Sequence, residues 1–320
     1  MTTEPAIPLG ARVVLRYRLP AGSTPPLTDV IGELVALDPV TIRVGDDQHV
    51  SVPAEQVVAL KALGPRPIRT REIRALETAA ADGWPGERQQ WIDGWLLRAG
   101  RGYTHRANSA APLGRSGEPA VLAAETLHRI AEWYADQGLP FQLLLPDRLA
   151  PVPQGWRTWN ETVVLGIDID NFVLPQGPPM VRTVSEPDTA WLDLHRYRGE
   201  NPALLAVPRQ PVPEVLTAVR DGKVGFAALG VPDPIAIGRA AVTTAPDLRR
   251  WVGVSCLAVQ SAHRRHGLGA LVCAELIRWG HARGATHAYV QVAADNPAAL
   301  ALYRDLGFLE HHSYRYAAPR

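Results

Sequence analysis

The feature that most constrains this chain is the stretch from Trp251 to Ala270, W-V-G-V-S-C-L-A-V-Q-S-A-H-R-R-H-G-L-G-A. Residues 251–259 form an apolar, β-branched run that predicts a strand, and apolar side chains recur at helical spacing over residues 267–283. Between them, four cationic side chains lead directly into two glycines, at His263, Arg264, Arg265, His266, Gly267 and Gly269. The first N–H groups of a helix lack helical partners and carry partial positive charge. The turn is therefore predicted to bind an anion, and a phosphate group fits it best.

Two common phosphate-binding motifs do not match this turn. A P-loop requires G-x-x-x-x-G-K-[ST], which occurs nowhere in the chain, and the only lysines are Lys61 and Lys223. A Rossmann turn requires G-x-G-x-x-G directly after the strand, whereas here the glycines follow a longer basic loop. Both motifs are therefore poor explanations of the predicted phosphate site.

Another pattern, R-x-x-G-x-G/A, is matched by Arg264, Gly267 and Gly269, and D-N-P-A-A-L-A-L-Y-R-D-L-G-F follows at residues 295–308. These two motifs, in this order, resemble the GNAT superfamily of acetyl-coenzyme A dependent N-acetyltransferases. The resemblance implies a mixed α/β GNAT fold and acetyl-coenzyme A as cosubstrate. It also implies that loop amides bind the pyrophosphate and that the end of the preceding strand pairs with the pantetheine arm. The expected cofactor-binding residues are Leu257, Val259, Arg264, Arg265, His266, Gly267, Leu268, Gly269, Ala270 and Asn296.

Tyr303 is the expected catalytic residue. It lies seven residues after Asn296, which is two helical turns along the same face. A phenol has a pKa of about 10 and a free thiol one of about 8.5, so a tyrosine close to the sulfur can donate a proton as the thiolate leaves. The resemblance gives Asn296 a hydrogen bond to the pantetheine arm and makes Tyr303 the general acid. Helix packing is the alternative role for Tyr303.

The group that removes the proton from the amine is left open by the sequence. Many members of the superfamily place a glutamate on the strand before the loop, and residues 252–256 contain none. Glu200, His195, a backbone carbonyl or a water chain could serve instead. Cys256 and Cys273 are the only cysteines, and both are interpreted as small buried hydrophobic residues.

Neither pair of neighbouring histidines is expected to bind a metal. Arg264 and Arg265 beside His263 and His266 would repel a divalent cation, and no cysteine or carboxylate completes a site there or at residues 311–312.

The rest of the chain predicts three parts. Residues 1–63 carry short strand-like runs between turns, which favour an SH3-like β-barrel with a docking or stabilising role. Residues 64–175 resemble a degenerate GNAT-like lobe, with strands expected at 91–99 and 105–111 and a helix at 119–137. Residues 176–320 are the expected acetyltransferase domain, with a helix over 188–197. The prolines of residues 64–67 predict a linker.

The acceptor is expected to be a primary amine, and a small amino acid such as glutamate is favoured over protein lysine. Residues 70–77, 93–98 and 251–255 resemble an actinobacterial group associated with N-acetylglutamate synthase activity, and Arg106 or Arg239 would suit a dicarboxylate. Arg98, Arg106, Asn108 and Ser109 could face a substrate carboxylate or simply form a hydrogen-bonded turn. An aminoglycoside-like amine remains open, as does an acyl-coenzyme A sensor or assembly module with little turnover.

Charge and hydropathy argue against polyanionic and membrane partners. The net charge of +1 calls for neither nucleic acid nor an anionic membrane, and no apolar run approaches the length of a membrane span. The first residues lack the basic and apolar segments of a signal peptide, so a cytoplasmic location is expected.

Overall fold

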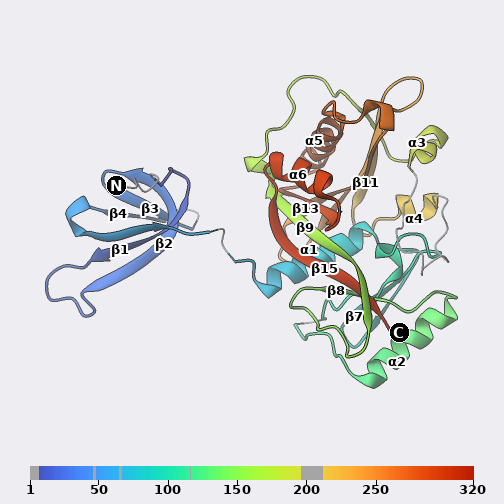
Figure 1. Cartoon of the computed structure of the whole chain (residues 1–320), viewed down its shortest axis with the longest axis horizontal. Helices are drawn as coiled ribbons and strands as arrows, with labels where there is room; N and C mark the ends of the chain where they lie inside the picture. The colour runs from blue at the N-terminus through green and yellow to red at the C-terminus, as the bar shows by residue number, and fades with distance from the viewer. Residues whose placement is uncertain (1–6, 46–47, 65–66, 116, 196–211) are drawn as a thin grey trace. The chain divides into compact units, whose positions relative to one another are not determined.

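A computed structural model gives the structure of the protein and describes residues 7–45, 48–64, 67–115, 117–195 and 212–320 (Figure 1). The chain separates into two compact units, Met1–Pro67 and Ile68–Arg320, and each is described by itself. Two residues of the expected linker, at positions 65 and 66, lie outside the described residues.

The first unit is a five-stranded antiparallel sheet in the order β4-β3-β2-β1-β5. Its strands are β1 (Arg12–Arg18), β2 (Leu27–Leu37), β3 (Val40–Val44), β4 (Gln48–Val52) and β5 (Val57–Ala62). Successive side chains of a strand point to opposite faces, so Val13, Leu15, Leu34 and Ile42 gather on one face, where all four are fully buried. This alternation gives the unit a core of its own.

The second unit is organised around an eight-stranded sheet in the order β10-β11-β12-β13-β14-β9-β15-β8. Among its paired strands only β13 and β14 are parallel in the described residues. The strands are β8 (Leu143–Pro146), β9 (Arg157–Asp168), β10 (Arg182–Val184), β11 (Lys223–Leu229), β12 (Ala236–Thr244), β13 (Arg250–Val259), β14 (His287–Ala293) and β15 (Leu309–Ala318). A separate hairpin is formed by β6 (Arg88–Ile92) and β7 (Trp95–Ala99).

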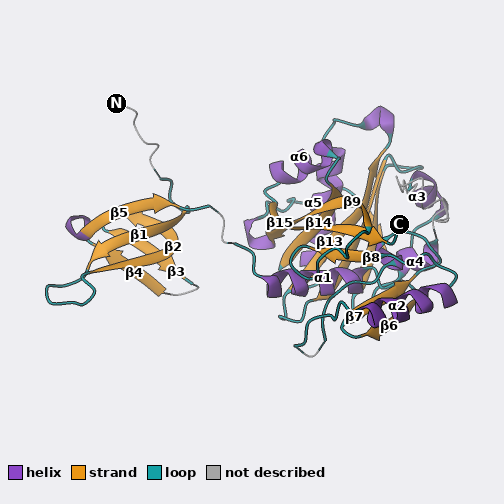
Figure 2. Cartoon of the chain, turned by 60° about the horizontal axis from the view of Figure 1, so that its bottom comes forward, coloured by secondary structure: helices purple, strands orange, loops and turns teal. Residues whose placement is uncertain are grey.

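Helices lie on both faces of this sheet (Figure 2). They are α1 (Thr70–Gly83), α2 (Ala124–Asp136), α3 (Thr189–Leu194), α4 (Pro213–Thr217), α5 (Leu268–His281) and α6 (Pro297–Asp305). Short 3-10 turns are η1 (Ala54–Gln56), η2 (Arg106–Asn108), η3 (Ile169–Asn171) and η5 (Ser261–His263). On β13, Val252 packs with α5 and Trp251 packs with α1, so these two helices cover opposite faces. No described helix is both long enough and apolar enough to cross a membrane.

The boundary expected near residue 175 falls inside the second unit. Strand β9, from the expected middle lobe, pairs with β14 on one side and β15 on the other. Both of these partners come from the expected C-terminal domain. Hydrogen bonding along both edges of β9 therefore joins the two stretches into one sheet.

Several expected elements are shorter than the sequence predicts. The helix over 119–137 begins only at Ala124, and the helix over 188–197 begins at Thr189 and ends at Leu194, with residues 196 and 197 outside the described residues. Asp188 is the N-cap of this second helix, because its Oδ1 accepts a hydrogen bond of 2.9 Å from the N–H of Trp191. The strand expected at 105–111 is wrong: this stretch contains the η2 turn and isolated bridges.

A buried ion pair joins the first helix of this unit to its sheet. Glu77 of α1 accepts a hydrogen bond of 2.9 Å from Nε2 of His312 in β15, and both side chains are buried. The Nδ1 atoms of His312 and His311 lie 2.8 Å apart. Burial, with repulsion from His312, lowers the pKa of His311 to about 3. His311 is therefore neutral at neutral pH.

Candidate functional site

The two parallel strands at the centre of the sheet separate from each other part of the way along. Strands β13 and β14 pair over four residues each. The first pair is Trp251 with His287, and the last is Val254 with Val290. Beyond that point β13 continues to pair with β12, while β14 continues to pair with β9. The facing edges of residues 255–259 and 291–293 thus diverge, and their backbone polar groups do not pair with each other.

The basic turn lies at the wide end of this opening and leads into α5. Gly267 is the N-cap residue and has a φ of 73°, a left-handed conformation that glycine adopts without steric cost. No side chain caps the helix, so its first N–H groups are not satisfied by one. The side chain of Arg264 turns back, and its Nε donates to the carbonyl of Val259 at 3.2 Å.

The other expected cofactor residues lie in this turn or on either side of it. Arg264, Arg265, His266 and Gly267 are exposed, while Leu268, Gly269 and Ala270 are half-buried in the first turn of α5. Leu257 and Val259 pack against the core on the α5 side of the sheet. A basic, exposed loop that ends at an uncapped helix N-terminus suits a pyrophosphate group.

The second expected motif forms the short helix α6. Asn296 is its N-cap, because Oδ1 accepts a hydrogen bond of 3.1 Å from the N–H of Ala299. The expected hydrogen bond from Asn296 to a ligand would therefore use its NH₂ group. Tyr303 packs edge-on to Phe308, with ring centroids 5.7 Å apart, and is only 6% exposed. Burial raises the pKa of Tyr303 above its ordinary value, so its phenol keeps its proton at neutral pH.

A β-bulge brings two consecutive side chains of β13 to one face of the sheet. The register against β12 shifts between Ile237 and Arg239, and Cys256 has a φ of 53°. Before the bulge, Ser255 lies on the face opposite α5; after it, Cys256 lies on that same face. A bulge of this kind redirects side chains. The hydroxyl of Ser255 is buried, and Ser255 helps to lower the pKa of the neighbouring Cys256 thiol.

A small pocket opens on this face beside the point where the strands separate. It is lined by Trp84, Arg106, Gly253, Val254, Ser255, Tyr289 and Gln291. Arg106 donates from Nε to the hydroxyl of Tyr314 at 3.2 Å and from Nη2 to the carbonyl of Gln291 at 3.3 Å. The lining contains a guanidinium and no carboxylate. The pocket therefore favours a negatively charged group over a positive one.

Arg239 has a different place from the one expected. It is fully buried, and Nε and Nη2 donate to three backbone carbonyls, those of Leu216, Gly83 and Ala218. Its guanidinium lies 4.1 Å from the ring centroid of Trp84, and burial lowers its pKa to about 10. Arg239 therefore ties together the backbone behind the pocket rather than lining it.

The polar residues of the turn after β7 also hold the backbone. Asn108 accepts hydrogen bonds from the N–H groups of Gly100 and Gly102 and donates to the carbonyls of Tyr103 and Thr104, all within 2.9 Å. Arg98 is buried against the backbone carbonyl and hydroxyl of Ser109. Of the four polar residues named from this stretch, only Arg106 lines the pocket.

One cluster at the site joins His195, which the sequence analysis named as a possible base, to residues that the sequence did not connect with it. His195 is buried at the end of α3, and its Nε2 lies 2.7 Å from the hydroxyl of Tyr103. Cys256 packs against the cluster that contains Tyr103 and Trp191, and its thiol and the His195 ring influence each other's pKa. Burial alone would raise the pKa of the thiol, but His195, helped by Arg239, brings it below its ordinary value. Burial likewise opposes protonation of His195, but Cys256 raises its pKa.

The lack of a carboxylate on residues 252–256 was the sequence signal that led to this cluster, because it made His195 one of the candidates for the base. Glu200, another candidate for the base, lies outside the described residues. Among the described residues, no three histidine, cysteine or acidic side chains are grouped as a metal site would require. The expectation that His263, His266, His311 and His312 bind no metal stays a prediction.

Comparisons with known proteins cover nearly the whole chain. Residues 70–317 match the family described as "Probable histone acetyltransferase Rv0428c C-terminal", and residues 7–61 match "Rv0428c N-terminal Sm-like domain". The first unit is thus matched as Sm-like, and the SH3-like description receives no support.

Two curated relatives and one solved structure are informative. The chain is 41% identical over 313 residues to "Probable histone acetyltransferase Rv0428c" of Mycobacterium tuberculosis, covering 96% of this chain and 94% of that protein. It is 26% identical over 255 residues to "Uncharacterized N-acetyltransferase YobR" of Bacillus subtilis, covering 76% and 98%. A GCN5-related N-acetyltransferase from Kribbella flavida aligns with a TM-score of 0.50 and 20% identity, over 77% of this chain and 94% of that one.

Proposed function

The chain belongs to the GNAT superfamily of N-acetyltransferases, and from this premise we propose that its acceptor is a small amine that carries a carboxylate, such as glutamate. The predicted mixed α/β GNAT fold is confirmed, and so are the activity class and the cosubstrate, acetyl-coenzyme A. The identity of the acceptor is the part that we propose.

The observation that carries this proposal is the charge of the pocket beside the diverging strands. Arg106 lines it together with Gln291 and Ser255, and no carboxylate does. Nε and Nη2 of Arg106 already donate to Tyr314 and Gln291, so its guanidinium would attract a ligand carboxylate mainly through its charge. A substrate held by its carboxylate in this pocket would present its amine to the opening between β13 and β14.

The donor half of the site follows from the basic turn. We assign pyrophosphate binding to the N–H groups at the start of α5, with Arg264, Arg265 and His266 supplying positive charge. The free edge of residues 257–259 would pair with the pantetheine amides. Asn296 would add one hydrogen bond to that arm, and Tyr303 would protonate the leaving sulfur.

Replacing Gly267 with aspartate is expected to weaken acetyl-coenzyme A binding by about tenfold or more, equivalent to about 1.4 kcal/mol. The added carboxylate would lie at the helix N-terminus, where it competes with and repels the pyrophosphate. Calorimetric titration of the purified protein measures the effect. Gly267→Asn is the matched control, because asparagine tolerates a positive φ as aspartate does but adds no charge. Equal affinities for the two variants would contradict a phosphate site here.

The acceptor is tested by following thiol release from acetyl-coenzyme A with glutamate, other amino acids, polyamines and a lysine peptide. We expect turnover with glutamate or a similar amino acid. The name of the mycobacterial relative refers to histone acetylation, so the lysine peptide is the most informative alternative acceptor. Turnover on the peptide with none on any amino acid would overturn the proposed acceptor class.

Arg106→Met is expected to raise the KM for the amino acid by about 100-fold, since a charged hydrogen-bonded contact contributes about 1.5–3 kcal/mol. The dissociation constant of acetyl-coenzyme A should stay the same, and its measurement also shows that the variant is folded. Arg115→Met is the control, because Arg115 is exposed and lies 5.8 Å from the ring centroid of Trp91, outside the pocket lining. A KM unchanged by Arg106→Met would exclude Arg106 from acceptor binding.

The roles of the remaining parts are also proposals. We propose that residues 64–175 are a degenerate GNAT-like lobe joined to the catalytic part, residues 176–320. Residues 1–63 would serve as a docking or stabilising module. A small-molecule acceptor, with neither nucleic acid nor membrane as a partner, fits a cytoplasmic location.

A further inference from the structure

We propose that Cys256 is the proton acceptor of this enzyme, and that His195 and Tyr103 position it for that role. The Cys256 thiolate, paired with the His195 imidazolium, would take a proton from the ammonium group of the acceptor. The inference rests on the amine-acetylating activity of the family and not on which amine is the acceptor.

The bulge in β13 places the thiol on the acceptor side of the sheet. Ser255 lines the pocket, and Cys256, its direct neighbour, packs with Tyr103 and Trp191 on the same face. Without the register shift, consecutive residues would point to opposite faces. The left-handed φ of Cys256 is uncommon for a residue other than glycine, and such backbone strain gathers at functional sites.

His195 is held by Trp191 and Tyr103, two members of the cluster against which Cys256 packs. Its ring centroid lies 5.0 Å from that of Trp191, and its Nε2 meets the hydroxyl of Tyr103 at 2.7 Å. A nucleophilic or basic thiol, an adjacent histidine and a third group that orients the histidine form a recurring catalytic arrangement. The Tyr103 hydroxyl is the orienting group here.

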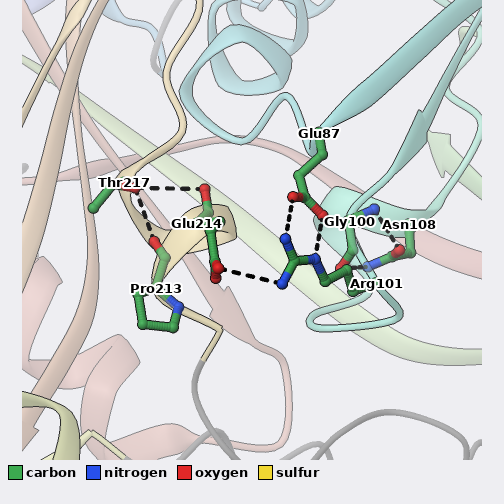
Figure 3. Close-up of polar contacts among 7 residues, drawn as sticks. All are labelled: Glu87, Gly100, Arg101, Asn108, Pro213, Glu214 and Thr217. Atoms are coloured by element: carbon green, nitrogen blue, oxygen red, sulfur yellow. Dashed lines mark hydrogen bonds and ion pairs between the residues drawn. The ribbon is translucent and has the colours of Figure 1, made fainter.

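The loop that carries Tyr103 is in turn fixed by polar contacts of Arg101 and Asn108, which Figure 3 shows in part. Asn108 binds four backbone groups of the loop that carries Tyr103, as described above. Beside it, Arg101 bridges Glu87 at 2.8 Å and Glu214 at 3.3 Å, which joins this loop to α4. The loop that carries Tyr103 is therefore tied both to Glu87, which precedes β6, and to Glu214 of α4.

The charges that face the pair favour the ionised thiol. His195 approaches Cys256 from α3, Arg239 faces both from β12, and the Tyr103 hydroxyl comes from the loop after β7. Arg239 stabilises a thiolate and opposes a second positive charge on His195. Strand β13 itself contains no aspartate or glutamate, so a carboxylate base would have to come from another element.

The chemistry balances with the groups already named. The thiolate removes one proton from the ammonium, and the nitrogen lone pair then attacks the thioester carbonyl carbon. The C–N bond forms, the C–S bond breaks, and the leaving sulfur takes the phenolic proton of Tyr303. The second nitrogen proton returns to the phenolate, and Cys256 gives its proton to water. The net products are the N-acetyl compound, coenzyme A thiol and one proton.

The first test measures thiolate formation in the whole protein without any acceptor, by ultraviolet absorbance and alkylation rate against pH. Cys273 is an internal reference, because burial raises its pKa to about 12. We expect one thiol that ionises well below the ordinary value. Cys256→Ser should abolish this signal, His195→Gln should move it to higher pH, and Cys273→Ala should leave it in place. A Cys256 thiol with an ordinary pKa, or with a pKa that stays the same in His195→Gln, would overturn the pairing of Cys256 with His195.

The second test is kinetic. Cys256→Ser and His195→Gln should each lower kcat by about 10²–10³-fold, the range of general acid–base catalysis, with acetyl-coenzyme A affinity unchanged. The deficit of Cys256→Ser should shrink as pH rises, because more of the amine then arrives neutral; a purely structural role predicts no such recovery. Full activity in Cys256→Ser would overturn the proposal. So would an S-acetyl group found on Cys256 by mass spectrometry, since the thiolate would then be a nucleophile.

Discussion

Replacing Tyr303 with phenylalanine is expected to lower kcat by about 10²-fold while the affinity for acetyl-coenzyme A stays the same. Burial holds the pKa of this phenol above its ordinary value, so it is a protonated donor across the working pH range. The loss of kcat should lie near the lower end of the range for general acid catalysis, because a thiolate is already a good leaving group. Single-turnover measurements of thiol release isolate the chemical step.

Phenylalanine preserves the ring contact with Phe308, so the folded structure should be retained. Tyr303→Leu is the comparison that removes both the ring and the hydroxyl. If Tyr303 serves only to pack α6, phenylalanine should be harmless to turnover while leucine lowers stability. An unchanged single-turnover rate in Tyr303→Phe would therefore assign the residue to packing.

Glu77→Ala is expected to cause the largest loss of folding stability, about 3–5 kcal/mol, because it leaves the other member of a buried pair without its partner. The carboxylate of Glu77 meets His312 at 2.9 Å between α1 and β15. Urea unfolding followed by tryptophan fluorescence measures the change. All nine tryptophans lie at position 84 or later, so the signal comes from the second unit alone.

The chain offers a matched control for this pair. His128 and Glu132 form the same type of contact at 3.2 Å, but both side chains are more than 60% exposed. Glu132→Ala should change the free energy of unfolding by no more than about 1 kcal/mol, because water already screens the pair. If Glu77→Ala and Glu132→Ala lower the free energy of unfolding by similar amounts, burial does not determine how much such a pair stabilises the fold.

The central strand, turn and helix could be predicted from the sequence because each leaves a local signal. The apolar run of residues 251–259 and the two glycines after the basic residues all lie within twenty consecutive residues, so the pattern can be recognised without any distant contact. The structure places a strand at Arg250–Val259 and a helix from Leu268. Short-range periodicity and turn chemistry are sufficient for such elements.

The parts that could not be predicted depend on residues far apart in the chain. Tyr103 and His195 are 92 positions apart, and neither carries a motif that indicates the other. Cys256 was interpreted as a buried hydrophobic residue because a regular strand gives no sign of a bulge. Arg239 was expected to face a substrate, whereas its Nε and Nη2 donate to carbonyls at the C-terminal ends of α1 and α4.

The position of β9 between β14 and β15 has a consequence for protein synthesis. Ribosomes make β9 first, ending at Asp168, whereas β14 begins at His287 and β15 at Leu309. Until both are made, a twelve-residue strand with buried apolar residues such as Val164 and Leu165 has two unpaired edges. Such edges attract other chains. The nascent polypeptide should therefore depend on chaperones over this interval, and fragments ending before His287 should aggregate when expressed.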